Sequence, residues 1–299
     1  MKFGRVIVLI FIMALAVLPV LGCQAEPQAE GSPARLACID MMQKVPVYYE
    51  NFEFWNIGTL RKDPDLAEMY QIWYERKVEF LEQNYGIEST SIDYLAEGEG
   101  LLDIFKANYD LDALRGRINA DFHRDTSYQD MEVWKSEPSP DPQSVTGGWV
   151  LSEGLLVRGA NYSNVEDYLR VIGGDELSMY DRNAADLLKE LPEGVLTRIN
   201  RSPYPEGLIV SGDSVEKMEG STLRWTNVYK FQSSETASSD EADEYFSKIE
   251  EDFNTAQNQL TSRGETPPFS EFTLEHDGEF VKWSMMIEEK YMIAMLFYG

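Results

Sequence analysis

Between residues 51 and 136 the sequence changes repeatedly between two periods, and this order of segments is the strongest constraint on the fold. Apolar and polar side chains alternate in four segments, as in strands with one buried face. These predicted strands span residues 51–60, 91–97, 101–107 and 131–136. One helix is predicted from the cap Asp63 to Gly86, and a shorter helix follows the cap Asp110. The order β-α-β-β-α-β favours an α+β fold with antiparallel sheets and helices packed on one face.

The remainder of the chain continues with the same two kinds of segment. Predicted strands span residues 147–153, 155–159, 195–201, 208–216 and 222–231. Predicted helices span residues 163–174, 183–191 and 238–264, and the first and last of them begin at the capping boxes Ser163–Glu166 and Ser238–Glu241. A hairpin turn is predicted at residues 276–279, and the apolar residues 292–299 predict a final strand.

A short internal repeat predicts two similar modules. Residues 99–118 and 153–172 share Glu-Gly-Leu-Leu, then Ala-Asn-Tyr, then a capped helix with Leu-Arg and an isoleucine. Each copy is typical of a strand that leads into a helix, which indicates duplication of a small α+β unit. The two predicted β-α-β-β-α-β-like modules span residues 45–175 and residues 176–299.

The N-terminus has the composition of a secretion signal. Lys2 and Arg5 precede the apolar run Val6–Leu21, and the small residue Gly22 follows it. A run of this length is also close to that of a short membrane span, so an uncleaved signal anchor is the alternative. Both interpretations place the folded body on the extracytoplasmic side of the cell membrane.

The last residues of this segment, Val20–Cys23, resemble the lipobox of bacterial lipoproteins. The resemblance implies that residues 1–22 are removed as a signal peptide and that Cys23 becomes the lipidated first residue. It also implies that residues 23–44 hold the lipid anchor, a flexible stalk that ends near Ala34, and a short helix. Duplicated small α+β units behind a lipobox are similar to an uncharacterised family of bacterial lipoproteins, and this likeness implies no activity.

Composition limits the possible partners. The chain has 43% hydrophobic residues, enough for a real core, and 52 acidic against 26 basic residues, a net charge of −26. This balance excludes nucleic acid as a partner and repels anionic lipid head groups, so acyl chains on Cys23 would have to hold the body at the membrane. With Cys23 lipidated, Cys38 is predicted to be a buried structural thiol without a disulfide.

Sequence motifs give little support to a catalytic function. His123, predicted in a loop, and His276, predicted in a hairpin turn, have no neighbour at a metal-ligand spacing. Phosphate-binding loops, dinucleotide fingerprints and nucleophile elbows are absent from the sequence, so we expect no metal and no cofactor. Ser214 and Lys217 match the pattern S-x-x-K, but on the predicted strand residues three apart point to opposite faces. They are weak candidates for a catalytic pair.

Three functions are compatible with these observations. The first is a non-enzymatic, membrane-tethered lipoprotein that binds an extracytoplasmic protein or polymer or associates with the envelope. The second is a hydrolase or transferase of envelope polymers that uses a carboxylate pair or Ser214 and Lys217. The third is a solute-binding lipoprotein, although the strand and helix order does not predict two doubly wound domains. A deep cleft that gathers carboxylates would discriminate among them.

Overall fold

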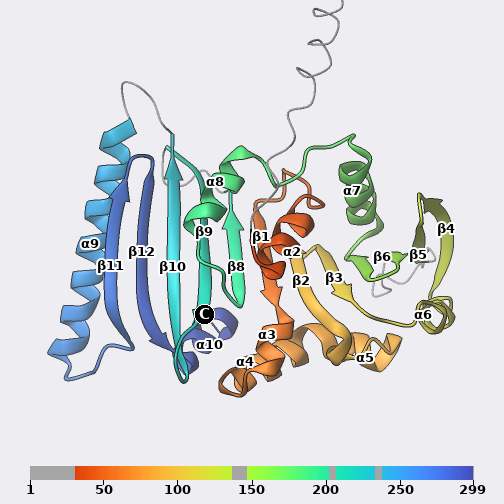
Figure 1. Ribbon diagram of the computed structural model, residues 1–299, viewed down its shortest axis with the longest axis horizontal. Coiled ribbons are helices and arrows are strands. Elements are labelled where there is room, and N and C mark those ends of the chain that lie inside the picture. The colour runs from red at the N-terminus through yellow and green to blue at the C-terminus, as the bar shows by residue number, and fades with distance from the viewer. Residues whose placement is uncertain (1–30, 137–146, 202–206, 233–237, 299) are drawn as a thin grey trace, which may run out of the picture.

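A computed structural model describes residues 31–136, 147–201, 207–232 and 238–298. In this part of the chain 12 strands form one sheet, in the order β11-β12-β10-β9-β8-β1-β2-β3-β7-β6-β5-β4, and every neighbouring pair is antiparallel (Figure 1). The strands are β1 Asn51–Asn56, β2 Ile92–Gly98, β3 Leu102–Ala107, β4 Phe122–Tyr128, β5 Met131–Ser136, β6 Gly148–Ser152, β7 Leu155–Gly159, β8 Leu196–Asn200, β9 Leu208–Lys217, β10 Thr222–Phe231, β11 Phe269–Asp277 and β12 Phe280–Glu288. The prediction of an α+β fold with antiparallel strands is confirmed.

The helices cover both faces of the sheet, so the prediction of helices on one face was wrong. They are α2 Pro33–Met42, α3 Ile57–Lys62, α4 Ala67–Trp73, α5 Glu79–Tyr85, α6 Leu111–Ile118, α7 Tyr162–Gly173, α8 Arg182–Glu190, α9 Ser238–Ser262 and α10 Glu289–Tyr298. One face, here called the cleft face, carries α3 to α6, α9 and α10, and the back face carries α2, α7 and α8. The reason is visible in β3, where Leu102 and Ile104 enter the core on the back face while Phe105 and Ala107 enter the core on the cleft face. A strand that is apolar on both faces needs cover on both.

The helical segment from Pro64 to Tyr85 begins and ends where the sequence predicts, although α3 precedes it on residues predicted as strand. The Asp63 side chain accepts a hydrogen bond from the backbone of Asp65 at 2.9 Å, and Gly86 ends the segment with a positive φ of 68°. Between α4 and α5 the helix widens into a π turn, Tyr74–Val78. The continuous apolar period of the sequence did not predict this turn, which places Arg76 and Lys77 next to each other at the cleft described below.

Some predicted elements differ from the observed ones at a chain end or a strand end. The predicted final strand is the helix α10, because Met, Ala and Leu are good helix formers and a short apolar run fits either structure. The strand predicted to Leu60 ends at Asn56, whose side chain caps α3. His123 lies on β4 instead of in a loop. The first turn of α7 is capped by Asn161 and Asn164, and not by the predicted Ser163–Glu166 box.

The predicted duplication is not confirmed. Residues 99–118 and 153–172 do share a secondary structure, since each forms the end of a hairpin followed by a helix. Strands β3 and β7 are antiparallel neighbours, yet α6 packs on the cleft face and α7 on the back face. A rotation that exchanges two antiparallel neighbours leaves their helices on the same face, so these two units are not equivalent by rotation.

The description begins at Gly31, so Cys23 and most of the predicted stalk lie outside it. The stalk ends earlier than predicted, because Ser32 already caps α2. Cys38 on α2 is buried as predicted, and burial raises the pKa of its thiol to about 12. Within the described ranges, no helix is both long and apolar enough to cross a membrane.

Candidate functional site

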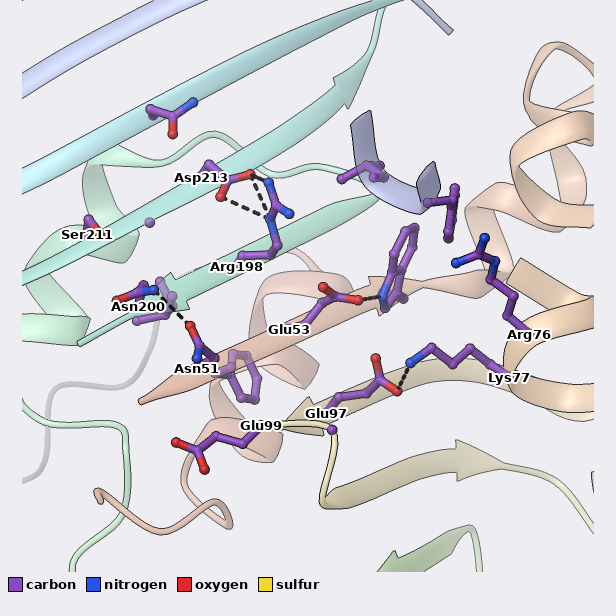
Figure 2. A pocket seen from close by; sticks show the side chains of 18 of the residues that line it. Asn51, Glu53, Arg76, Lys77, Glu97, Glu99, Arg198, Asn200, Ser211 and Asp213 are labelled. Atoms are coloured by element: carbon purple, nitrogen blue, oxygen red, sulfur yellow. Dashed lines mark hydrogen bonds and ion pairs between the residues drawn. The ribbon is translucent and has the colours of Figure 1, made fainter. Parts of the chain in front are cut away.

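The cleft face has a cleft of about 730 Å³ near the middle of the sheet (Figure 2). Its floor is formed by strands β2, β1, β8, β9 and β10, and its rim by the π turn and by Leu296 and Phe297 of α10. The volume lies within the range of ordinary ligand sites. It is the candidate functional site of this chain.

The floor is built from side chains that the strand register places side by side. Seven polar residues on neighbouring strands form one line across the sheet, here called the polar row: Asn227, Asp213, Arg198, Glu53, Glu97, Asp103 and Arg158. A second line, which runs parallel to it, contains Tyr229, Ser211, Asn200 and Asn51. On the other side of the polar row, a third line of paired residues is apolar and is here called the apolar line: Trp225, Val215, Leu196, Trp55, Leu95, Phe105 and Leu156.

This change from apolar to polar explains why the cleft is open. The apolar line belongs to the core beneath α3 to α6 and α10. Helices bury apolar surface, and they would lose free energy if they covered charged side chains without pairing them. The sequence therefore leaves the polar row uncovered along part of its length.

Two ion pairs hold the floor in place. Arg198 donates to both carboxylate oxygens of Asp213, with N–O distances of 2.9 to 3.1 Å, and the indole of Trp225 donates to the same carboxylate at 3.0 Å. Lys77 reaches from the π turn to Glu97, with 2.5 Å between Nζ and Oε1. Figure 2 shows both pairs on the floor of the cleft. Paired charges on sheet strands are rigid, which makes the floor a preorganised surface.

The centre of the polar row is unusually acidic. Glu53, Glu97 and Asp103 are direct neighbours on β1, β2 and β3. Burial and the neighbouring Glu97 raise the pKa of Asp103 to about 7, and the same two causes raise the pKa of Glu53. Burial opposes the charge on Lys77, but Glu97 outweighs it and raises the lysine's pKa. Close carboxylates cannot all ionise freely, so this row retains a proton near neutral pH.

Asn227 ends the row with an unsatisfied donor. Its side chain lines the cleft, and the residue is only 9% exposed. Within the described part of the chain, its Nδ2 has no hydrogen-bond partner. A buried amide without a partner costs free energy, which a ligand acceptor would recover.

The residues singled out by motif do not form a site. Ser214 is fully buried, and its Oγ donates to the backbone carbonyl of Leu196 at 3.2 Å. The Lys217 ammonium instead contacts Asp65 at 3.1 Å and a turn carbonyl. The lipidation candidate Cys23 lies outside the described residues.

We therefore expect no acylation of Ser214 by fluorophosphonate or β-lactam probes. A hydroxyl that is buried and donates to a carbonyl has no base to remove its proton. Mass spectrometry of the intact protein checks this after incubation with each probe. Stoichiometric labelling that disappears in Ser214→Ala would contradict the expectation and favour an acyl-transferring enzyme.

The hydrolase or transferase hypothesis invokes a carboxylate pair, whose residues the sequence does not assign. Glu53, Glu97 and Asp103 each lie two residues from a core residue on the same face of their strand, and these core residues are Trp55, Leu95 and Phe105. An acidic residue on the apolar side of a predicted strand is the sequence signal that could have identified these carboxylates. Pairing between strands, which joins these positions, is not readable from one sequence. Among the described residues, no group of three or more His, Cys, Asp or Glu side chains is arranged to hold a metal ion.

Comparison with known proteins finds no relative: no protein-family model, no curated protein and no solved structure significantly matches this chain.

Proposed function

We propose that this protein is a membrane-tethered extracytoplasmic lipoprotein that binds a polar ligand in the cleft and does not transform it. The observation that supports this proposal most is the polar row, a rigid set of charged and amide groups of which most line a cleft in the middle of a large sheet. Such groups reduce stability unless they are paired, and their retention at one open place is typical of a binding site.

A binding function fits the floor better than a structural one. Asp213 is satisfied by Arg198 and Trp225, so its orientation is fixed before a ligand arrives. The Nδ2 of Asn227 has no hydrogen-bond partner among the described residues. A site with fixed charges and an unused donor can gain affinity from a ligand with no more reorganisation than the rotation of one amide group.

A cleft-filling variant tests this function. Ser211 lines the cleft on β9, and Ser211→Trp would place an indole over the floor. Soluble protein without residues 1–30 is screened by thermal unfolding against polar fragments of cell-envelope polymers, amino acids and short peptides. A ligand at 100 times its Kd adds about 2.7 kcal/mol, a shift of roughly 5 to 10 °C in Tm.

The matched control is Ser247→Trp, the same change at an exposed position of α9. We expect ligand stabilisation in the wild-type protein and in the control, and its loss in Ser211→Trp. A ligand that stabilises Ser211→Trp as much as the wild type would place the binding site outside the cleft and overturn the proposal.

The tether rests on the resemblance of Val20–Cys23 to a lipobox. We expect Cys23→Ala to release the full-length protein into the soluble extracytoplasmic fraction or to leave it as unprocessed precursor, because no acyl chain then holds the acidic body. Fractionation and the mass of the mature N-terminus check this. A correctly cut Cys23→Ala protein that stays in the membrane would refute the lipid anchor.

A second candidate function is hydrolysis of an envelope polymer. One specific observation favours it: adjacent carboxylates, of which Asp103 has a pKa of about 7, provide an acid and a base at neutral pH. Turnover of a polymer that is lost in Glu53→Gln, with ligand binding retained, would promote this function over binding alone.

A further inference from the structure

We propose that the ligand of the cleft is a short peptide segment with a lysine-like ammonium group, which lies against Glu53 and Glu97 while a backbone carbonyl of the segment accepts from Asn227. This inference rests on the proposed function, because it assigns the chemical class of the ligand to the same cleft. Nothing in the motifs of the sequence points to it; it follows from the charges and spacing of the polar row.

The charges of the cleft leave room for one cation. Four carboxylates line it (Glu53, Glu97, Glu99 and Asp213), against three cationic side chains (Arg76, Lys77 and Arg198). Arg198 is engaged by both oxygens of Asp213, and Lys77 by Glu97. Asp103, behind the cleft, faces Arg158 at 3.7 Å. Glu53, which accepts a hydrogen bond from the Trp55 indole, and Glu99, which accepts one from the backbone of Glu50, have no ion-pair partner among the described residues. Of the two, Glu53 lies at the centre of the row.

The pKa values of the carboxylates agree with this excess of negative charge. Burial and Glu97 raise the pKa of Asp103 to about 7, so a proton partly occupies that carboxyl near neutral pH, and the same causes raise the pKa of Glu53. An ammonium group in the cleft favours the ionised carboxylates. Its binding must then release protons, which gives the inference a readout that is independent of any variant.

Spacing indicates an extended ligand. Asn227 on β10 and Glu53 on β1 are separated by three strand intervals in the same register line. Neighbouring strands lie about 4.8 Å apart, so the two side chains start roughly 14 Å from each other. An extended peptide advances about 3.3 Å per residue and covers this distance with about four residues. Rotation of the terminal torsion of Asn227 turns its amide nitrogen toward an acceptor.

The aromatic side chains of the cleft favour a peptide over an amino sugar. A sugar ring needs an open aromatic face to stack on, but Phe52 and Trp55 are buried. The rings of Phe297 and Tyr229 are packed against Trp55 and Tyr245, with centroid distances of 5.9 Å and 4.8 Å. Besides the three cationic side chains, the polar groups that remain for recognition are carboxylates, amides and hydroxyls.

The experiment is titration calorimetry at pH 6.5 with an acetylated, amidated tetrapeptide Ala-Ala-Ala-Lys, compared with the same peptide ending in norleucine. We expect the lysine peptide to bind at least about tenfold more tightly than the norleucine peptide, since charge-assisted hydrogen bonds are the stronger ones. Binding measured in two buffers of different ionisation enthalpy should show proton release. Affinity should fall as salt is added.

Variants locate the interaction. We expect Glu53→Gln to weaken the lysine peptide by about tenfold and Asn227→Ala by about fivefold, whereas Glu251→Gln, the same change at an exposed position of α9, leaves the affinity unchanged. Thermal unfolding confirms that each variant is folded. The wild-type comparison of the two peptides decides the question even if Glu53→Gln does not fold.

Equal binding of the two peptides, uptake of protons, or tighter binding of a glucosamine tetramer would overturn the inference. So would an equal loss of affinity in Glu251→Gln. If the lysine peptide fails but Ser211→Trp still abolishes stabilisation by another polar ligand, the ligand class is wrong and the binding function stands. If Ser211→Trp abolishes nothing, the proposed function itself fails.

Discussion

Replacing Asp103 with asparagine raises the free energy of unfolding above pH 7 and flattens its dependence on pH between about 4 and 7. In the folded protein, burial and the neighbouring Glu97 raise the pKa of Asp103 to about 7, far above the value near 4 of an unfolded chain. Over this window the folded state therefore binds more protons than the unfolded state. The stability that protonated Asp103 contributes is fully present below pH 4 and is lost as the pH rises through 7.

Asparagine has the same shape and no charge to ionise, so Asp103→Asn removes this loss. We expect a gain of at least about 1 kcal/mol at pH 8 and little change at pH 4, because one unit of pKa shift corresponds to about 1.4 kcal/mol. The half-exposed Arg158, which faces Asp103 at 3.7 Å, keeps its contact with water. Urea denaturation from pH 4 to pH 8 measures the effect.

The matched control is Asp277→Asn, at an exposed position of the β11–β12 hairpin. It should leave the pH profile of stability unchanged. A variant Asp103→Asn that is less stable than the wild type at pH 8 would show that Asp103 is ionised and favourably paired, and the acidic centre of the polar row would need another description.

Replacing Gly194 with alanine destabilises the protein by about 3 kcal/mol or prevents folding. A Cβ at this position would lie 2.3 Å from the carbonyl oxygen of Val215 and 2.5 Å from Oγ of Ser214. Neither atom can move easily, because the carbonyl of Val215 accepts a hydrogen bond at 2.7 Å from the backbone of Val195, the residue before β8, and Ser214 is buried. Forcing a methyl group against fixed backbone is an overpacking defect.

Gly116→Ala is the matched comparison. Gly116 lies in α6, is exposed, and has open space where the methyl group would go. Alanine favours the helix by about 1 kcal/mol over glycine, so this variant should be more stable than the wild type. Chemical denaturation of both variants measures the contrast. A Gly194→Ala protein as stable as the wild type would show that the junction between α8 and β8 tolerates displacement.

Local signals were enough to predict most of the elements. Asp63, Gly86 and Asp110 mark helix ends in the sequence and do so in the structure, because a cap satisfies backbone groups that no neighbour in the helix can reach. The strand residues 102–107 and 222–231 were also predicted at or near their observed limits. Where two structures fit one pattern, as in α10, the prediction depended on tertiary packing and was wrong.

The candidate site could not be predicted from the sequence, because it depends on which strands pair with each other. Glu53, Glu97 and Asp103 are separated by 44 and 6 residues in the chain and become neighbours only through the order β1-β2-β3. Which face of the sheet each helix packs on also depends on strand pairing. Both faces of β3 are apolar, so helices pack on each of them. Lys77 reaches the row only because of a π turn, which a period of 3.6 residues does not reveal.

The position of the cleft on the seam between β1 and β8 also restricts how a ligand can enter. Backbone hydrogen bonds of an antiparallel ladder join residues 51–55 to residues 196–200, so the two halves of the chain share one continuous floor at this point. A clamshell motion, in which two lobes swing shut around a ligand, would have to break that ladder. Binding should therefore need no large motion of the protein. The association rate should be high, and it should depend on solvent viscosity only as diffusion does. Differences in affinity between related ligands should then be expressed in their residence times.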